Sequence, residues 1–393
     1  MKYTLLATLV LSLLSPAARA NWEQTLAQAR GQTVYFNAWG GSEAINRYIA
    51  WAGKETQKRY GVSVKHVKTA DTAEVIRRIA AEKAAGRTQG GSVDLVWING
   101  ENFRSMKNQA LLSAPFAKDL PNWRYVDLKK PVERDFAEPT QGLESPWGGA
   151  QLTFIADRSR VPAPPDSMTS LLAFAKAHPG RVSYPKPPQF HGTSFLKQAL
   201  LELAPNPTLL QQPVSAAVFA RETRALWAYL DQLHPLLWRK GQAFASSGEQ
   251  TLQMMADGEL LLGISFNPNE VPNLIAAKRL PKTAYSYGHK GGTLANVHFV
   301  AIPFNARSAA AAKVLANFLL SPEAQVKKAD VAIWGDPSVL DPAKLPAAQG
   351  AALRQSAAGS LPASVKTLAE PHASWVDALE KEWLRRYGKA GGA

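Results

Sequence analysis

The sequence predicts an α/β protein with mixed, mostly parallel sheets flanked by helices. Short apolar segments rich in β-branched and aromatic residues alternate with longer segments whose apolar residues recur at helical spacing. This alternation is typical of βα units in parallel sheets. The chain has 393 residues, which is enough for two domains, and no internal repeat of solenoid length is visible.

The first twenty residues have the pattern of a secretory signal peptide. Lys2 gives a positive start, Leu5–Leu14 is a short apolar stretch, and Ala18-Arg19-Ala20 fits the small-residue cleavage pattern. The apolar stretch is too short to span a membrane as a helix. We therefore expect the mature chain to begin near Asn21 and to be a soluble protein of the periplasm.

The chain contains no cysteine. This excludes disulfides, thiol catalysis, Cys-ligated metals and a lipid-anchored N-terminal cysteine, so we do not expect a lipoprotein. The seven histidines are widely separated in the sequence, and none has the close spacing of a metal site. We predict neither a metal nor another cofactor.

The formal net charge is +14, but the basic residues are scattered along the chain. Most of them fall on the polar faces of predicted helices. A solvated surface explains this distribution better than a nucleic-acid groove does, so we predict no nucleic-acid partner. A basic surface favours contact with anionic partners in general, without identifying a ligand.

The first βα unit contains the most informative turn of the chain. Val34–Phe36 has the composition of a buried strand, and the apolar spacing of Ile45–Ala52 predicts a helix. The turn between them has a serine suited to the helix N-cap. It also has two glycines that let a ligand approach backbone N–H groups at a helix N-terminus. An ordinary βα turn with a core tryptophan is the alternative. The turn consists of Trp39, Gly40, Gly41 and Ser42.

Two further βα units follow. Val62–Val67 alternates as a strand, and the helix expected over Thr69–Ala85 has a capping-box-like start at Asp71. Val93–Ile98 has the composition of a buried strand, and the turn residues Asn99-Gly100 end it before another helix.

The middle of the chain contains the first expected crossover between domains, at Leu143–Ala156. This segment ends in an apolar strand, Ala150–Ala156. Beyond it, a helix is expected over Ser170–Ala177, a short strand over Arg181–Tyr184, a capped helix start at Thr193-Ser194 and a long helix over Arg221–Leu237.

The last third continues the alternation. A helix through Met255 precedes the apolar strand Glu259–Phe266 and the polar loop Asn267–Glu270. Asn296–Ile302 is a strong strand and the second expected crossover. Helices are expected over Ala309–Leu320, from Pro322 onward and over Trp375–Arg386, whereas Pro337–Leu361 looks irregular.

Several segments are similar to those of a known family. They include the Trp-Gly-Gly-Ser turn, V-D-L-V-W-I-N-G-E-N at Val93–Asn102 and G-E-L-L-L-G-I-S-F-N-P-N at Gly258–Asn269. The F-L-L-S-P-E-A-Q helix junction that ends at Gln325 is the most specific. In these segments and in the order of its parts, nearly the whole mature chain resembles the extracytoplasmic solute-binding proteins of ABC importers. Within the type II arrangement, the chain is most similar to the YnjB-like group.

The resemblance implies a two-lobed periplasmic binding protein-like fold of type II. Lobe one would comprise residues 21–146 and 303–330, and lobe two 147–302 and 331–393, with crossovers near 143–156 and 296–304. It also implies a non-enzymatic monomer that holds a small solute between its lobes. The partners would be an ABC permease in the inner membrane and its ATPase.

Physical reasoning and the resemblance select the same loops for the ligand. Ligands of open α/β sheets bind beyond the carboxyl ends of the strands, and a two-lobed site closes by a hinge motion. Trp97 is expected to be a core residue. The predicted ligand-binding residues are Trp39, Gly40, Gly41, Ser42, Asn99, Glu101, Trp147, Thr193, Ser194, Asn267, Asn269, Glu270, Trp334 and Asp336.

Two ligand chemistries stay open. Glu101 and Glu270 could neutralise a cation held against the faces of Trp39 and Trp147, which would suit an amine or a thiamine-like ring. Hydroxyl groups at the predicted helix starts suit a phosphate or carboxylate equally well. A structural alternative for Glu101 is that it lies in a first helical turn, where the dipole favours a negative charge.

The wider family includes binding proteins for thiamine, polyamines, ferric iron and sugars. The iron binders typically use two adjacent tyrosines. The nearest pattern in this chain is Tyr285-Ser286-Tyr287, which departs from that motif.

An enzyme is the main alternative to a binding protein. The sequence has no G-x-S-x-G elbow, H-E-x-x-H helix or Walker loop. Acidic residues are plentiful, so a secreted carboxylate-dependent hydrolase acting on a periplasmic polymer is the alternative function. Saturable binding with a thermal shift would favour the binding protein, and turnover would favour the hydrolase.

Overall fold

The computed structural model describes residues 16–355 and 357–388. The part of the signal-peptide prediction that covers Met1–Ser15 lies outside these residues. The first described element is helix α1 (Pro16–Ala29), which contains the predicted cleavage position after Ala20. Within the described ranges, no helix is both long and apolar enough to cross a membrane.

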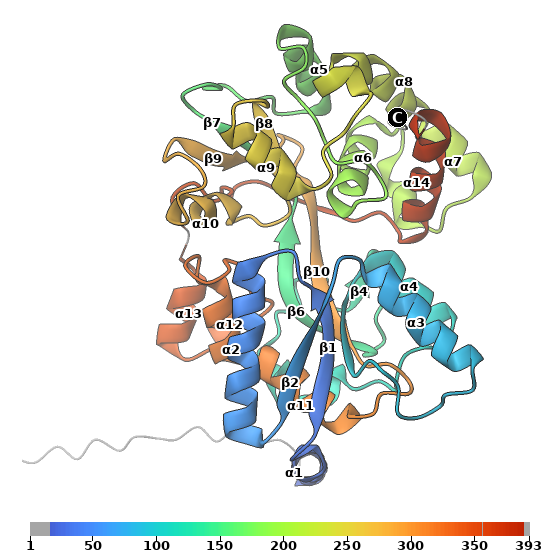
Figure 1. Ribbon diagram of the computed structural model, residues 1–393, viewed down its shortest axis with the longest axis vertical. Helices are drawn as coiled ribbons and strands as arrows, with labels where there is room; N and C mark the ends of the chain where they lie inside the picture. The colour runs from blue at the N-terminus through green and yellow to red at the C-terminus, as the bar shows by residue number, and fades with distance from the viewer. Residues whose placement is uncertain (1–15, 356, 389–393) are drawn as a thin grey trace, which may run out of the picture.

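The described residues form two lobes with separate cores (Figure 1). The core of the first lobe draws mainly on Ala29–Val126 and Val297–Leu345. That of the second draws on Leu152–Leu294 and, much later in the chain, on Trp375–Trp383. This arrangement confirms the predicted two-lobed α/β fold.

The sheet of the first lobe has the strand order β11-β10-β3-β1-β2, and β6 also pairs with β10. β1 (Thr33–Trp39) runs parallel to β2 (Ser63–Thr69) and to β3 (Leu95–Ile98). Because these strands point the same way, the turns that follow Trp39 and Ile98 lie at one edge of the sheet, which faces the second lobe (Figure 1). The other elements of this lobe are α1, α2 (Glu43–Tyr60), α3 (Thr72–Ala84), α4 (Gly100–Asn108), β4 (Arg134–Asp135), β5 (Glu138–Pro139), α11 (Ala309–Leu319), α12 (Pro322–Ala329) and α13 (Ala347–Leu353).

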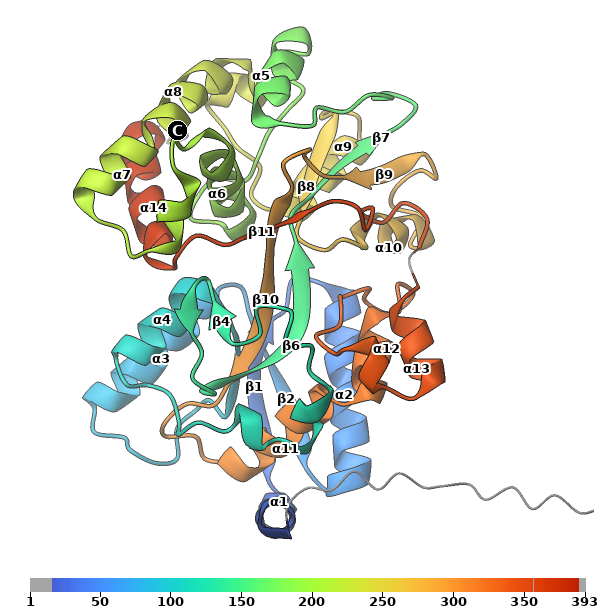
Figure 2. The ribbon, with the colours of Figure 1, turned by 180° about the vertical axis from the view of Figure 1, so that it is seen from behind.

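Two strands run from one lobe into the other (Figure 2). β6 (Glu144–Gln151) and β10 (Thr293–Ala301) are antiparallel neighbours. One end of β10 pairs with β3, and the other pairs with β11 (Thr367–Ala369). These strands occupy the two segments in which the crossovers were expected.

The three-stranded sheet of the second lobe differs from the prediction. Its central strand β7 (Thr153–Asp157) is antiparallel to both β8 (Leu262–Ser265) and β9 (Ala284–Tyr287). Apolar composition predicts that a strand is buried but not the direction of its neighbours, so the sequence could not reveal this. The helices of the lobe are α5 (Met168–Ala177), α6 (Phe190–Leu203), α7 (Ala216–Glu222), α8 (Arg224–Leu233), α9 (Gly248–Ala256), α10 (Glu270–Ala276) and α14 (Ser374–Tyr387).

Three local predictions in this lobe were wrong. Arg181–Tyr184 forms no strand, and only the next residue makes an isolated bridge. The long helix expected from Arg221 is divided at Thr223 into α7 and α8. Helix α6 begins at Phe190 rather than at Thr193, because the side chain of Gln189 accepts the backbone N–H groups of its first turn.

The segment after α12 packs with the first lobe. Trp334, Val339 and Leu340 belong to its core, and Leu353 packs against that core. By Leu361 the chain is in the second lobe, where the Leu361 backbone N–H donates to the carbonyl of Pro268. The predicted domain division had assigned 331–393 to lobe two. We propose instead that 331–353 belongs to lobe one and that the chain crosses a third time after it.

Candidate functional site

The Trp39–Ser42 turn lies at the sheet edge that faces the second lobe. The Trp39 ring is half-buried and covers Gly41, where an added Cβ would lie 2.4 Å from the indole. Ser42 occupies the N-cap position of α2, but its side chain makes no capping hydrogen bond, so that expectation was wrong. The backbone N–H groups in the first turn of α2 therefore donate no hydrogen bond to the Ser42 side chain.

The second turn at this edge begins α4. Asn99 is the N-cap and makes no side-chain capping bond. The Gly100 backbone N–H instead donates to Oδ2 of Asp135 at 2.6 Å. Gly100 has a φ of +60°, and an added Cβ would lie 2.5 Å from the Phe136 ring, so only glycine fits here. This packing fixes the position of Glu101, the next residue.

Glu101 faces acidic groups of the other lobe. Burial, with a smaller contribution from the negative charges of Glu380 and Asp377 on α14, raises the pKa of Glu101 to about 7, although the positive charge of Lys197 on α6 opposes this rise. Burial likewise raises the pKa of Glu380 to about 7. The two lobes thus bring several carboxyl groups together with one buried ammonium group.

Thr193 and Ser194 lie in the second turn of α6. The Thr193 hydroxyl donates to Oε1 of Glu380 at 2.6 Å, so it helps to orient that carboxyl group. Ser194 has no exposed surface, and its hydroxyl has no hydrogen-bond partner. Neither hydroxyl lies at a helix start, which removes the reason for expecting them to bind an anion.

Trp147 is a core residue. It has no exposed surface and lies in an aromatic cluster with Trp97 and Trp334, whose ring centres are 4.9 and 5.4 Å from its own. The ammonium of Lys328 lies 5.4 Å from its ring centre. The face that sequence reasoning offered to a ligand cation is therefore covered by the protein itself. Trp97 packs against the same core, as expected.

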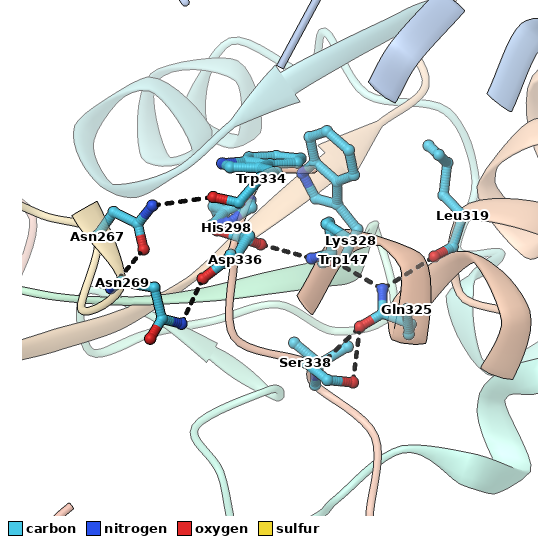
Figure 3. Close-up of polar contacts among 12 residues, drawn as sticks. Trp147, Asn267, Asn269, His298, Leu319, Gln325, Lys328, Trp334, Asp336 and Ser338 are labelled. Atoms are coloured by element: carbon cyan, nitrogen blue, oxygen red, sulfur yellow. Dashed lines mark hydrogen bonds and ion pairs between the residues drawn. The ribbon is translucent and has the colours of Figure 1, made fainter. Parts of the chain in front are cut away.

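The Trp334–Asp336 turn joins this cluster to the second lobe (Figure 3). Asp336 is buried and pairs with Lys328 at 2.5 Å and with His298 at 3.0 Å. Burial opposes ionisation, but the His298 and Lys328 partners hold the pKa of Asp336 below its ordinary value. Asn267 and Asn269 contact the same turn through its backbone carbonyl groups.

Glu270 lies apart from the Glu101 group, at the start of α10. Burial, together with the negative charge of Glu249, raises its pKa to about 7. The Ser265 hydroxyl donates to its Oε2 at 3.3 Å. The predicted residues thus fall into four groups: the Trp39–Ser42 turn, the Asn99–Glu101 and Thr193–Ser194 contact region, the buried Trp147 cluster with its bound asparagines, and Glu270.

Comparisons with known proteins identify the family. The model of the bacterial extracellular solute-binding protein family matches residues 51–363. The chain is also 54% identical to protein YnjB of Escherichia coli K12 over 380 residues, which is 96% of this chain and 97% of that one. The chain belongs to the bacterial extracellular solute-binding protein family.

Solved structures show the same fold for this solute-binding protein. The periplasmic binding protein AfuA of Actinobacillus pleuropneumoniae, with fructose-6-phosphate bound, is 16% identical with a TM-score of 0.64 over 91% of this chain and 99% of that one. The spermidine/putrescine ABC transporter substrate-binding protein PotD of Streptococcus pneumoniae is 14% identical with a TM-score of 0.59, over 91% of this chain and 99% of that one. At these identities the likeness is one of fold alone.

Sequence reasoning missed several residues of this solute-binding protein where the lobes meet. Lys197 and Glu380 are charged residues on helices, a position that usually indicates a solvated face. Phe190, at the start of α6, is 38% exposed and lies 5.9 Å from the Lys197 ammonium. No spacing in the sequence reveals that α6 and α14 meet the other lobe. Among the described residues, no group of His, Asp and Glu side chains is arranged to hold a metal.

Two cavities can be described in this solute-binding protein. One of about 220 Å³ lies beside the Trp334–Asp336 turn and is lined by Lys130, Asn269, Ser338 and neighbours. The other is an open groove of about 500 Å³ over α2 and β2, lined by Lys54 and Lys58, among others. Asn269 is the one predicted site residue in these linings.

Proposed function

We propose that this protein is the periplasmic solute-binding component of an ABC importer. It would be exported by a cleaved signal peptide, capture a small solute between its lobes and deliver that solute to a membrane permease with its ATPase. Family membership supports capture of a solute. The parallel strands of the first lobe support a binding position between the lobes, because they direct the turns after Trp39 and Ile98 towards the second lobe.

The proposed solute is a small organic cation, such as an amine. The observation that carries this is an acidic contact region in a basic chain. Glu101 of one lobe faces Asp377 and Glu380 of the other, and the net charge of the whole chain is +14. Burial disfavours ionisation of Glu101 and Glu380, and a nearby cation would reverse that effect. Trp39 and Phe190 would supply aromatic surface for it.

The proposed ligand contacts are the groups at this interface that retain exposed surface. They are the Trp39–Ser42 turn, Asn99 and Glu101, joined by Glu380 and Phe190. Thr193 is buried and acts through its hydrogen bond to Glu380. Trp147 and Ser194 are fully buried and are not included. No structural observation favours the hydrolase alternative, and we do not propose it.

The deciding experiment is mass spectrometry of small molecules released when the purified protein is denatured, followed by a thermal-shift titration with the molecule found. We expect one cationic solute that raises the melting temperature saturably. Glu101→Gln should abolish most of this shift, whereas Glu74→Gln, on the exposed start of α3, should not. A stabilising anionic solute would refute the proposed class, and turnover without a stabilising ligand would refute the binding function.

A further inference from the structure

Three asparagines of the second lobe bind one turn of the first. Asn267 Nδ2 donates to the Trp334 carbonyl at 3.3 Å, and Asn269 Nδ2 donates to the Gly335 carbonyl at 2.6 Å. Asn273 Nδ2 also donates to the Trp334 carbonyl. Three side chains from one lobe thus converge on two consecutive carbonyl groups of the other (Figure 3 shows Asn267 and Asn269).

The orientation of two of these amides, those of Asn267 and Asn269, is fixed by their other contacts. Asn267 Oδ1 accepts the backbone N–H of Asn269 at 2.9 Å, and Asn269 Oδ1 accepts the Ser360 hydroxyl at 2.7 Å. Since each oxygen already has a donor from the second lobe, each Nδ2 group faces the first lobe. Asn267 and Asn269 are therefore oriented as donors by their own lobe.

The Trp334–Asp336 turn is held equally firmly by the first lobe. The Trp334 ring packs against Tyr48, with 5.4 Å between ring centres. The backbone N–H of Gly335 donates to Asp330 and Lys328 carbonyls at 2.9 and 3.0 Å. Asp336 is paired with Lys328 and His298, as described above. The two carbonyl groups are thus presented on a rigid support.

The fit between the two sides depends on Gly335. Its φ is +79°, and an added Cβ would lie 2.8 Å from Cβ of Asn269 and 3.2 Å from Nδ2 of Asn273. A side chain at this position would separate the lobes or distort the turn. The side chains of the second lobe therefore pack directly against the backbone of this turn.

We infer that Asn267, Asn269 and Asn273 form a latch that holds the lobes together by binding the Trp334–Gly335 carbonyl groups. Each hydrogen bond crosses from one lobe to the other, so separation of the lobes must break all three. The latch gives a role in lobe closure to four residues that sequence reasoning had assigned to the ligand: Asn267, Asn269, Trp334 and Asp336. It rests on the proposed function only in that lobe closure serves solute capture.

The test measures the distance between the lobes in the absence of any solute, so its result does not depend on the proposed ligand. Because the chain has no cysteine, Lys58→Cys and Lys282→Cys provide unique exposed sites for spin labels on the two lobes. We expect pulsed electron–electron double resonance to show a longer and broader distance distribution between the two spin labels for Asn269→Ala/Asn273→Ala than for the labelled parent. Asn108→Ala, at an exposed position, should leave the distribution unchanged.

A second pair of variants distinguishes disruption of the contact between the lobes from backbone strain at a glycine with positive φ. Gly335→Ala should also lengthen the distance. Gly180→Ala imposes similar strain, because the φ of Gly180 is +78°, but nothing lies within 4 Å of its added Cβ, so the distance should stay that of the parent. Parental distributions in both the double asparagine variant and Gly335→Ala would overturn the latch. If Gly335→Ala does not fold, the asparagine variant alone decides.

Discussion

The ammonium group of Lys197, in the second lobe, lies 4.2 Å from the centre of the Phe136 ring in the first lobe. The same ammonium pairs with Glu370 at 2.7 Å, and both side chains of this pair are 2% exposed. Asn296, on the strand β10 that joins the lobes, donates to the other Glu370 oxygen at 2.9 Å. A buried ion pair of the second lobe thus meets an aromatic ring of the first beside a connecting strand.

Removal of one member of this pair should destabilise the protein strongly. Lys197→Met keeps most of the packing volume but leaves the Glu370 carboxylate buried without its counter-ion. We expect a loss of about 3–5 kcal/mol in the free energy of unfolding, measured with urea. Lys197→Met/Glu370→Gln should recover a large part of that loss, since it removes both charges. Purely additive losses would show that the two charges are not coupled.

The acidic contact region predicts a specific dependence of stability on pH. Burial raises the pKa of Glu101 and of Glu380 from 4.5 to about 7 in the folded protein. The folded state therefore holds more protons at these groups than the unfolded state between about pH 4.5 and pH 7. Their contribution favours folding at low pH and is lost as the pH rises through this window.

Glu101→Gln and Glu380→Gln should each remove part of this dependence. The difference in unfolding free energy between variant and parent should shift in favour of the variant as the pH rises from 4.5 to 7, as measured by urea unfolding at several pH values. Glu74→Gln, at an exposed position, is the control. A constant difference across the window would contradict the raised pKa values.

The sequence predicted the sheet edge of the site better than it predicted the site itself. The turns after Trp39 and Ile98 could be placed together, because parallel strands end at a common edge. Trp147 could not be recognised as buried, because the groups that cover it come from segments far apart in the chain, among them those of Phe36, Trp97 and His298. Glu380 was missed for a similar reason: an acidic residue on an amphipathic helix gives no sign that its face meets another lobe.

Trp39 and Trp147, two of the three tryptophans that were predicted to bind the ligand, should behave differently. Trp147 has no exposed surface, so Trp147→Ala should cost about 3–5 kcal/mol in the free energy of unfolding. Trp39 is half-buried at the edge of the sheet, so Trp39→Ala should leave the melting temperature nearly unchanged. Its effect should appear as a smaller amount of solute released from the denatured protein. A large loss of melting temperature in Trp39→Ala would make it a core residue instead.

The serine residues at two helix starts give a last, matched comparison. Ser42 and Ser167 both occupy N-cap positions with extended backbone. The Ser167 hydroxyl accepts the backbone N–H of Ser170 at 3.1 Å and completes a capping box, whereas the Ser42 hydroxyl makes no capping bond. Ser167→Ala should therefore cost about 1 kcal/mol in the free energy of unfolding, and Ser42→Ala should cost much less. If Ser42→Ala also weakens retention of the solute, the hydroxyl acts on the ligand, because the helix does not depend on it. Equal losses of stability in the two variants would show that Ser42 caps α2 in solution and would remove the reason for assigning its hydroxyl to the ligand.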